Sequence, residues 1–113
     1  MTRPIRRHDA GDLTHRFILE RRAERPDGFG GHLTDYLPEG AVWGAPRTVR
    51  GREDLRAAQI DETVDHAITV RFRADIRPGW RLRRGSRAFD VVAAYDPDER
   101  RRYLVLETRE RAT

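Results

Sequence analysis

The segment Val64-Asp-His-Ala-Ile-Thr-Val-Arg-Phe-Arg73 alternates between two kinds of side chain for longer than any other part of the sequence. His66, Ile68, Val70 and Phe72 fall on one face of an extended chain, with polar or small residues on the other. This period of two is typical of a strand buried on one side. We therefore expect the segment to be the central strand of a small β-domain.

The sequence after this strand predicts a turn and then a hairpin. Pro78-Gly79 has the residue order of a type II turn. Gly85-Ser86 separates two runs of strand-forming residues and suits a two-residue hairpin loop with glycine first. The predicted register pairs Leu82 with Phe89, Trp80 with Val91, and Arg81 with Asp90. Two apolar pairs then share one face while an ion pair lies on the other, as expected of a correct register.

The rest of the sequence predicts further strands, separated by turns. We expect strands over 13–22, with Leu13, Phe17 and Leu19 inward, over 33–43, interrupted or shortened at 38–40, and over 103–108. Turns are predicted at 26–31 and 96–99, where glycine, proline and aspartate gather. Residues 44–62 contain three breakers and then good helix formers over 52–60, which predicts an extended loop with a short helix. That helix either reaches a neighbouring molecule or plugs one end of a barrel.

Together these segments predict an all-β fold, a small antiparallel β-barrel of about six strands with one long loop that carries a short helix. A sandwich of the same strands is the alternative. Residues 1–12 have almost nothing to bury and are expected to be a flexible arm, which leaves 13–111 as a single barrel domain. The expected core consists of Phe17, Ile68, Val70, Phe72, Trp80, Leu82, Phe89 and Val91.

The charge composition predicts a protein that works through its surface. Charged residues make up 37% of the 113 residues, as much as the hydrophobic ones, and all 23 basic residues are arginine. Residues 71–87 hold seven arginines and one acid, whereas 27–65 hold eight acids and four arginines. This asymmetry suits electrostatic matching between copies or with a neighbour. A GC-rich coding sequence explains the arginine bias equally well.

Several function classes find no support in the sequence. The four histidines have no compact ligand spacing, so we expect no metal. The single serine, Ser86, lies in a predicted turn without a nucleophile motif, and the acid pairs are adjacent in sequence, so we expect neither an enzyme nor a cofactor. No apolar run approaches about 18 residues, and the charged N-terminus lacks a signal-peptide core, which predicts cytoplasmic synthesis and no membrane partner.

Several blocks of the sequence, in order, resemble phage head-tail joining proteins, also called head-closure or stopper proteins. The blocks are 11–21, Asp27-Gly28-Phe29-Gly30-Gly31, Val42-Trp43, Gly51-Arg52-Glu53 with Ala57 and Gln59, His66 to Arg73, Gly85 to Phe89, and 104–110. Gly44 departs from the family pattern, since alanine commonly follows the tryptophan, and the N-terminal arm has no family counterpart. The same family serves tailed phages and gene transfer agents, and the sequence does not separate the two.

The resemblance implies a β-barrel subunit that forms a homo-oligomeric ring in the neck of a phage or phage-like particle. The ring would lie between a portal or adaptor protein and a tail-terminator protein, close the DNA channel after packaging and offer a docking platform for the tail. We expect the 46–65 loop to contact DNA or carboxylates through Arg47, Arg50, Arg52, Glu53 and Arg56. The expected interface strip consists of Arg71, Arg73, Arg77, Arg81 and Arg83.

A small basic barrel that binds nucleic acid nonspecifically is the alternative function. The arginines of 71–87 could contact phosphates without reading sequence, and such binding would weaken steeply with salt. The predicted hairpin register, however, places Trp80 in the core, where it cannot stack on bases. Nonspecific contact with packaged DNA remains compatible with either function.

Overall fold

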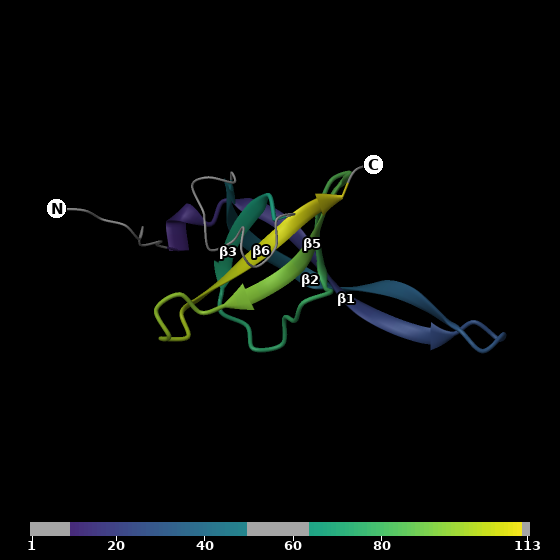
Figure 1. Ribbon diagram of the computed structural model, residues 1–113. Helices are drawn as coiled ribbons and strands as arrows, with labels where there is room; N and C mark the ends of the chain where they lie inside the picture. The colour runs from purple at the N-terminus through teal and green to yellow at the C-terminus, as the bar shows by residue number, and fades with distance from the viewer. Residues whose placement is uncertain (1–9, 50–63, 112–113) are drawn as a thin grey trace.

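The computed structural model of the chain describes residues 10–49 and 64–111. Six strands form a closed antiparallel barrel in the order β1-β2-β3-β6-β5-β4 (Figure 1), which confirms the predicted fold class. The strands are β1 (His15–Pro26), β2 (His32–Thr48), β3 (His66–Arg71), β4 (Arg81–Arg84), β5 (Arg87–Tyr95) and β6 (Tyr103–Arg111), preceded by the 3-10 turn η1 (Ala10–Asp12). Residues 1–9 of the expected arm and the expected helix over 52–60 lie outside the described residues.

Strand β3 lies between β2 and β6 and supplies two fully buried side chains, Ile68 and Val70. Its outward residues Ala67 and Thr69 are also buried, so the strand is covered on both faces rather than on one. The register explains part of this difference, because Ala67 lies between Arg47 on β2 and Glu107 on β6. A short side chain between two long ones is shielded from solvent by its neighbours.

The β4–β5 hairpin has the predicted register, with Leu82 opposite Phe89 and Arg81 opposite Asp90. Gly85, the first loop residue, has a φ of 63°, as a hairpin loop with glycine first requires. The type II turn before β4 is also confirmed: the Trp80 N–H donates to the Arg77 carbonyl at 3.1 Å, and Gly79 has a φ of 97°.

The ion pair predicted across this hairpin is wrong. The Arg81 Nε donates to Glu20 of β1 at 2.9 Å, and Asp90 pairs with Arg111 of β6 at 3.0 Å. Arg81 and Asp90 are directly opposite in the β4–β5 ladder. Each nevertheless pairs with a residue on its second neighbouring strand: Arg81 with a carboxylate on β1, and Asp90 with a guanidinium on β6. In a closed barrel every strand has two neighbours, and a hairpin considered alone shows only one of them.

Strands β1 and β2 extend well beyond the barrel as a two-stranded ribbon, drawn in blue in Figure 1. Only Ile18, Leu19 and Glu20 of β1 pair with β4, whereas β1 and β2 remain paired out to Pro26 and His32. The turn at 26–31 is therefore the tip of a long hairpin. At the base of the ribbon Glu39 and Gly40 together oppose Leu19, which makes a β-bulge in β2, and Gly40 has a φ of 104°.

Strand β2 does not end at Trp43 and is not interrupted at Pro38. It runs through the bulge and on to Thr48, where residues 44–48 pair with β3. The predicted loop over 44–62 therefore starts several residues too early. Both prolines lie where β2 is paired on one side only, since β1 pairing stops at Gly44 and β3 pairing starts there. A proline at such a position loses no ladder bond.

The barrel is filled by apolar side chains from five of the six strands and from the turn before β4. Phe17 and Phe89 meet edge to face, with ring centroids 5.9 Å apart. Gly44 leaves the space in which Ile68 and Phe17 pack against β2. The buried cluster consists of Phe17, Leu19, Ile68, Val70, Ile76, Trp80, Leu82, Phe89, Val91, Leu104 and Leu106, with Val42, Phe72 and Ala94 packed against it.

Candidate assembly surfaces

Between its base and its tip, the ribbon pairs charged side chains of β1 with those of β2. Arg21 pairs with Glu39 at 2.8 Å and Arg25 with Asp35 at 2.7 Å, each across the two strands. Leu33 and Leu37 lie on the same face as Asp35, because side chains two residues apart point the same way along a strand. Both leucines are exposed, so this face offers apolar contact area between satisfied ion pairs.

The tip of the ribbon presents one aromatic ring to solvent. Phe29 lies among three glycines and is 93% exposed. The loop that carries it is ordered by Asp27, whose Oδ1 accepts the N–H groups of Phe29 at 2.7 Å and Gly31 at 3.0 Å. The backbone of the loop is thus ordered by hydrogen bonds to Asp27, while the phenyl ring of Phe29 stays in solvent. An exposed aromatic on a stiff loop is the kind of residue that anchors protein interfaces.

A second apolar surface lies on the outside of β2. Val42 packs against the core and Gly44 is buried, so Ala41 and Trp43 point outward, and Trp43 is 53% exposed. A pocket of about 490 Å³ opens there, and its described lining consists of Leu13, Ala41, Val42, Trp43, Arg71 and Arg73. The register that pairs Gly44 with Val70 places Trp43 and Arg71 at neighbouring positions. Tryptophan and arginine together are enriched at interface hot spots.

The two cations of this pocket differ in their surroundings. Arg73 donates twice to Asp75, at 3.0 and 2.8 Å, and this pairing raises the pKa of Arg73 while it lowers that of Asp75. Arg71 is exposed, and none of the ion pairs between described residues involves it. Of the two pocket cations, Arg71 is thus the one without an ion pair to a described residue.

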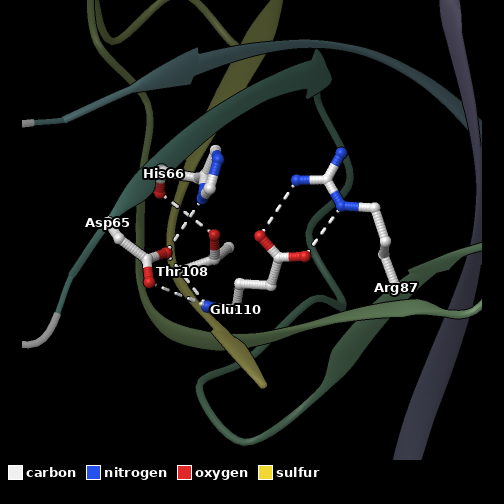
Figure 2. A network of polar contacts seen from close by, with 5 residues as sticks. All are labelled: Asp65, His66, Arg87, Thr108 and Glu110. Atoms are coloured by element: carbon white, nitrogen blue, oxygen red, sulfur yellow. Dashed lines mark hydrogen bonds and ion pairs between the residues drawn. The ribbon is translucent and has the colours of Figure 1, made fainter. Parts of the chain in front are cut away.

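The base of the segment that joins β2 to β3 is fixed by a polar network (Figure 2). The Asp65 Oδ1 lies 2.9 Å from the His66 Nδ1 and 2.9 Å from the Glu110 N–H, which donates to it. The Thr108 hydroxyl donates to the His66 carbonyl at 3.0 Å. Beside this network, the Val49 N–H donates to the Asp65 carbonyl at 3.0 Å. These contacts join Val49 to Asp65, and Asp65 and His66 to β6.

Arg87 extends the same network to the β4–β5 hairpin. Its Nε and Nη2 donate to the two carboxylate oxygens of Glu110 at 2.7 and 2.9 Å, a bidentate pair (Figure 2). The guanidinium holds the pKa of Glu110 below its ordinary value, and the carboxylate raises that of Arg87. The hairpin, the end of β6 and the base of the 50–63 segment are thereby connected.

The arginines expected to form one interface strip do not share one environment. Arg81 and Arg83 both pair with the buried Glu20, at 2.9 and 3.2 Å, and Arg81 also lies 3.7 Å above the Tyr36 ring. Arg73 pairs with Asp75, whereas Arg71 and Arg77 are exposed. Arg81 in particular is half-buried and joins β4 to β1.

The arginines expected in the 46–65 loop are mostly outside the described residues. Arg47 is exposed near the end of β2, directly opposite Ala67 of β3. Arg50, Arg52, Glu53 and Arg56 lie in the segment that the structure does not describe. The structure thus places the start of the expected contact loop but not its centre.

Two negative findings concern the described residues. Over 10–49 and 64–111 no group of three or more histidine, cysteine, aspartate or glutamate residues could hold a metal ion. Within the same residues, no helix is long and apolar enough to cross a membrane.

Sequence reasoning did not single out Phe29 or Trp43 as exposed anchors. The sequence predicts a turn at Phe29 and a strand end at Trp43. A signal for Phe29 was present, since a lone aromatic among three glycines has no neighbours with which to build a core. Trp43 gave no such signal, because an alternating strand pattern does not reveal which face points outward.

Comparison with known proteins gives a family and two related folds. The family of phage head completion proteins matches residues 8–111 of the chain. No curated protein is significantly similar to it. The solution structure of a protein from Shigella flexneri 2a has a TM-score of 0.71 at 22% identity, covering 93% of this chain and 98% of that one. A chain from the virion of a native gene transfer agent particle has a TM-score of 0.62 at 25% identity, covering 89% and 97%.

Proposed function

This chain belongs to the phage head completion protein family, and we propose that it is a structural protein of the head–tail connector. In this proposal it forms a ring that closes the DNA channel after packaging and provides the platform on which the tail docks. The match of nearly the whole chain to the family carries the proposal. A gene transfer agent virion contains a chain of similar fold, which supports a place in a phage or phage-like particle.

The shape of the subunit supports assembly rather than catalysis. Apolar side chains of the described residues fill the barrel. Among the same residues the exposed aromatic side chains are Phe29 at the ribbon tip, Trp43 on the outside of β2 and Tyr95 at the end of β5. Exposed apolar residues that gather into a patch, unlike ones scattered singly, mark contact surfaces. The portal or adaptor protein on the head side and the tail-terminator protein on the tail side are the proposed partners. The chain would be made in the cytoplasm and incorporated into the neck.

Loss of the gene tests this function directly. Producing cells that lack the chain should release DNA-filled heads without tails, and supplying the chain in trans should restore tailed particles. Electron microscopy of purified particles distinguishes the two states. Normal yields of tailed particles without the chain would contradict the proposal.

The 46–65 loop is proposed to contact DNA or the carboxylates of a neighbouring ring. Replacing Arg47, Arg50, Arg52 and Arg56 with glutamine should reduce DNA retention or particle assembly, because each guanidinium offers a charged fork to phosphate or carboxylate. DNA retention is measured as nuclease-resistant DNA per purified head. Unchanged assembly and DNA retention in this fourfold variant would refute the role of the loop.

The alternative of an independent nucleic-acid-binding barrel has less support. Trp80 is buried, and three of the five strip arginines are paired within the chain. An independent binder should retain DNA on its own, with an affinity that falls steeply as salt rises. A filter-binding assay of the purified chain over a series of salt concentrations separates this function from a role confined to the particle.

A further inference from the structure

We propose that the tip of the β1–β2 ribbon inserts Phe29 into the pocket beside Trp43 on a second copy of this chain. The inference rests on the proposed ring and specifies the contact between neighbouring subunits. It follows from two surfaces of the same chain that match each other in chemistry. We call the ribbon tip the donor surface and the pocket beside Trp43 the acceptor surface.

The donor is a stiff loop with one aromatic ring and one charge. Phe29 is 93% exposed, and the Asp27 carboxylate is the only formal charge in residues 27–31. Asp27 fixes the loop through two backbone N–H groups, so the ring is presented without a further loss of loop entropy on binding. Leu33 and Leu37 add two exposed apolar side chains on one face of the ribbon, on either side of the ion-paired Asp35.

The acceptor combines an apolar floor with a cation. Leu13, Ala41, Val42 and Trp43 supply apolar walls to a pocket of about 490 Å³, enough for a phenyl ring. Arg71 also lines the pocket and, among the described residues, has no ion-pair partner. When the ring of Phe29 enters, the Asp27 carboxylate two residues away would meet this guanidinium. Aromatic insertion and charge pairing thus favour the same orientation.

The tip cannot fill the pocket of its own chain. Trp43 lies eleven positions after His32 along β2, which is roughly 35 Å of extended strand. Figure 1 shows the ribbon tip at the opposite end of the molecule from η1, and Leu13 of the pocket directly follows η1. A ribbon tip that fills this pocket must therefore come from another molecule.

A contact between two different surfaces of the same chain also has the symmetry that a ring needs. The donor of one subunit meets the acceptor of the next, whose own donor is free for the one after it. Such head-to-tail contacts close into a ring when the rotation between neighbours permits. A self-complementary contact would stop at a dimer.

Cross-linking within assembled particles tests this contact without removing its anchors. The chain has no cysteine, so His32→Cys near the tip and Arg16→Cys beside Trp43 would be its only thiols. Both positions are exposed. A short bismaleimide should link tip to pocket between subunits and give a ladder of dimers and higher oligomers on a denaturing gel. His32→Cys with Arg84→Cys is the matched control, because Arg84 is exposed at the end of β4, away from the pocket lining.

The outcomes separate this inference from the proposed function. A ladder in the first variant that exceeds the control supports the contact. If the chain is present in tailed particles and the first variant gives no more cross-links than the control, the contact is wrong while the function stands. If the chain is absent from particles that still join their tails, the proposed function falls and the inference falls with it.

A second measurement uses the anchor itself. Phe29→Ala should leave the melting temperature of the purified chain unchanged, because the ring touches little of its own subunit. Particles made with it should contain at least about tenfold fewer copies of the chain, as expected when a hot-spot anchor is removed. Arg84→Ala is the control for an exposed residue elsewhere. A wild-type copy number in Phe29→Ala particles would overturn the contact.

Discussion

Two phenylalanines mark opposite extremes of exposure in this chain. Phe89 is 2% exposed and touches both the Phe17 ring and the His66 ring edge to face, whereas Phe29 is 93% exposed. A phenyl group gains most of its free energy from leaving water. Phe89 gains this free energy on folding, and Phe29 can gain it only from a partner.

Phe89→Ala should lower the free energy of unfolding by about 3 to 5 kcal/mol, because it removes a buried ring and leaves a cavity among core side chains. Phe29→Ala, the matched control, should change it by less than about 0.5 kcal/mol. Urea unfolding followed by tryptophan fluorescence measures both. A loss below about 1 kcal/mol for Phe89→Ala would mean that this ring does not pack as the structure describes.

Gly44 shows how a single residue fits the chain to its own core. A Cβ added there would lie 2.9 Å from the Ile68 Cγ2 and 3.2 Å from both a Phe17 ring carbon and the Thr69 carbonyl. The missing side chain at Gly44 therefore allows β2 to pack closely against Ile68 and Thr69 of β3.

Gly44→Ala should therefore destabilise the barrel by about 1 to 3 kcal/mol through overpacking. Gly11→Ala is the control, since nothing lies within 4 Å of an added Cβ there. Thermal unfolding of the two variants compares them. Equal melting temperatures would show that Ile68 can move aside freely.

At the scale of the elements, the best predictions came where two kinds of information agreed. The β4–β5 register followed from a glycine-first turn together with matching apolar pairs on its two strands. The length of β2 did not follow, because Pro38, Gly44 and Pro46 are typical strand breakers. Each is tolerated where β2 has only one neighbour or where the core needs space. Which side of a strand is unpaired depends on the closed barrel, not on local sequence.

The join between β5 and β6 should make stability depend on pH. The bonded guanidinium of Arg87 holds the pKa of Glu110 below its ordinary value of 4.5. The folded chain therefore binds this proton less readily than the unfolded chain, so the pair stabilises the fold above the unfolded pKa. That contribution is lost as pH falls through the lowered, folded pKa.

Glu110→Gln should consequently be less stable than the parent at neutral pH, with a difference that shrinks as pH falls through the lowered pKa of Glu110. Arg87→Gln should behave in the same way, because either change removes the pair. Urea unfolding at several pH values measures the difference. A gap that stays constant down to acid pH would rule out the pair as its origin.

At the scale of the whole molecule, charge patterns in the sequence did not reveal which charges remain available. Arg81 and Arg83 were expected on an interface, yet their carboxylate partner Glu20 is about sixty residues earlier in the chain. The acids Asp35 and Glu39 likewise pair with arginines across the ribbon. Some of the acidic and basic side chains that were expected to pair between subunits thus pair within one subunit instead. Exposed aromatic residues are the better guide to assembly here.

A shortened ribbon separates folding from assembly. Replacing residues 25–33 with Asn-Gly would join Glu24 to Thr34, which are opposite in the ladder, through a two-residue turn. The barrel should keep its melting temperature within a few degrees, because none of the core cluster lies in the removed segment. Tail joining should fail, as counted by electron microscopy of the particles. Normal tail joining with the shortened chain would show that the ribbon has no part in assembly.

The bulge at Glu39 and Gly40 lies at the base of the ribbon and so influences the direction in which the ribbon leaves the barrel. From Gly40 to Gly31 the ribbon covers roughly 30 Å, so a change of about 10° in its direction would move the tip by about 5 Å, close to the width of a phenyl ring. The backbone angle of one glycine, with a φ of 104°, therefore helps to set where a neighbouring subunit is met. In a ring of identical subunits the same small angle repeats at every joint and bears on the diameter of the channel.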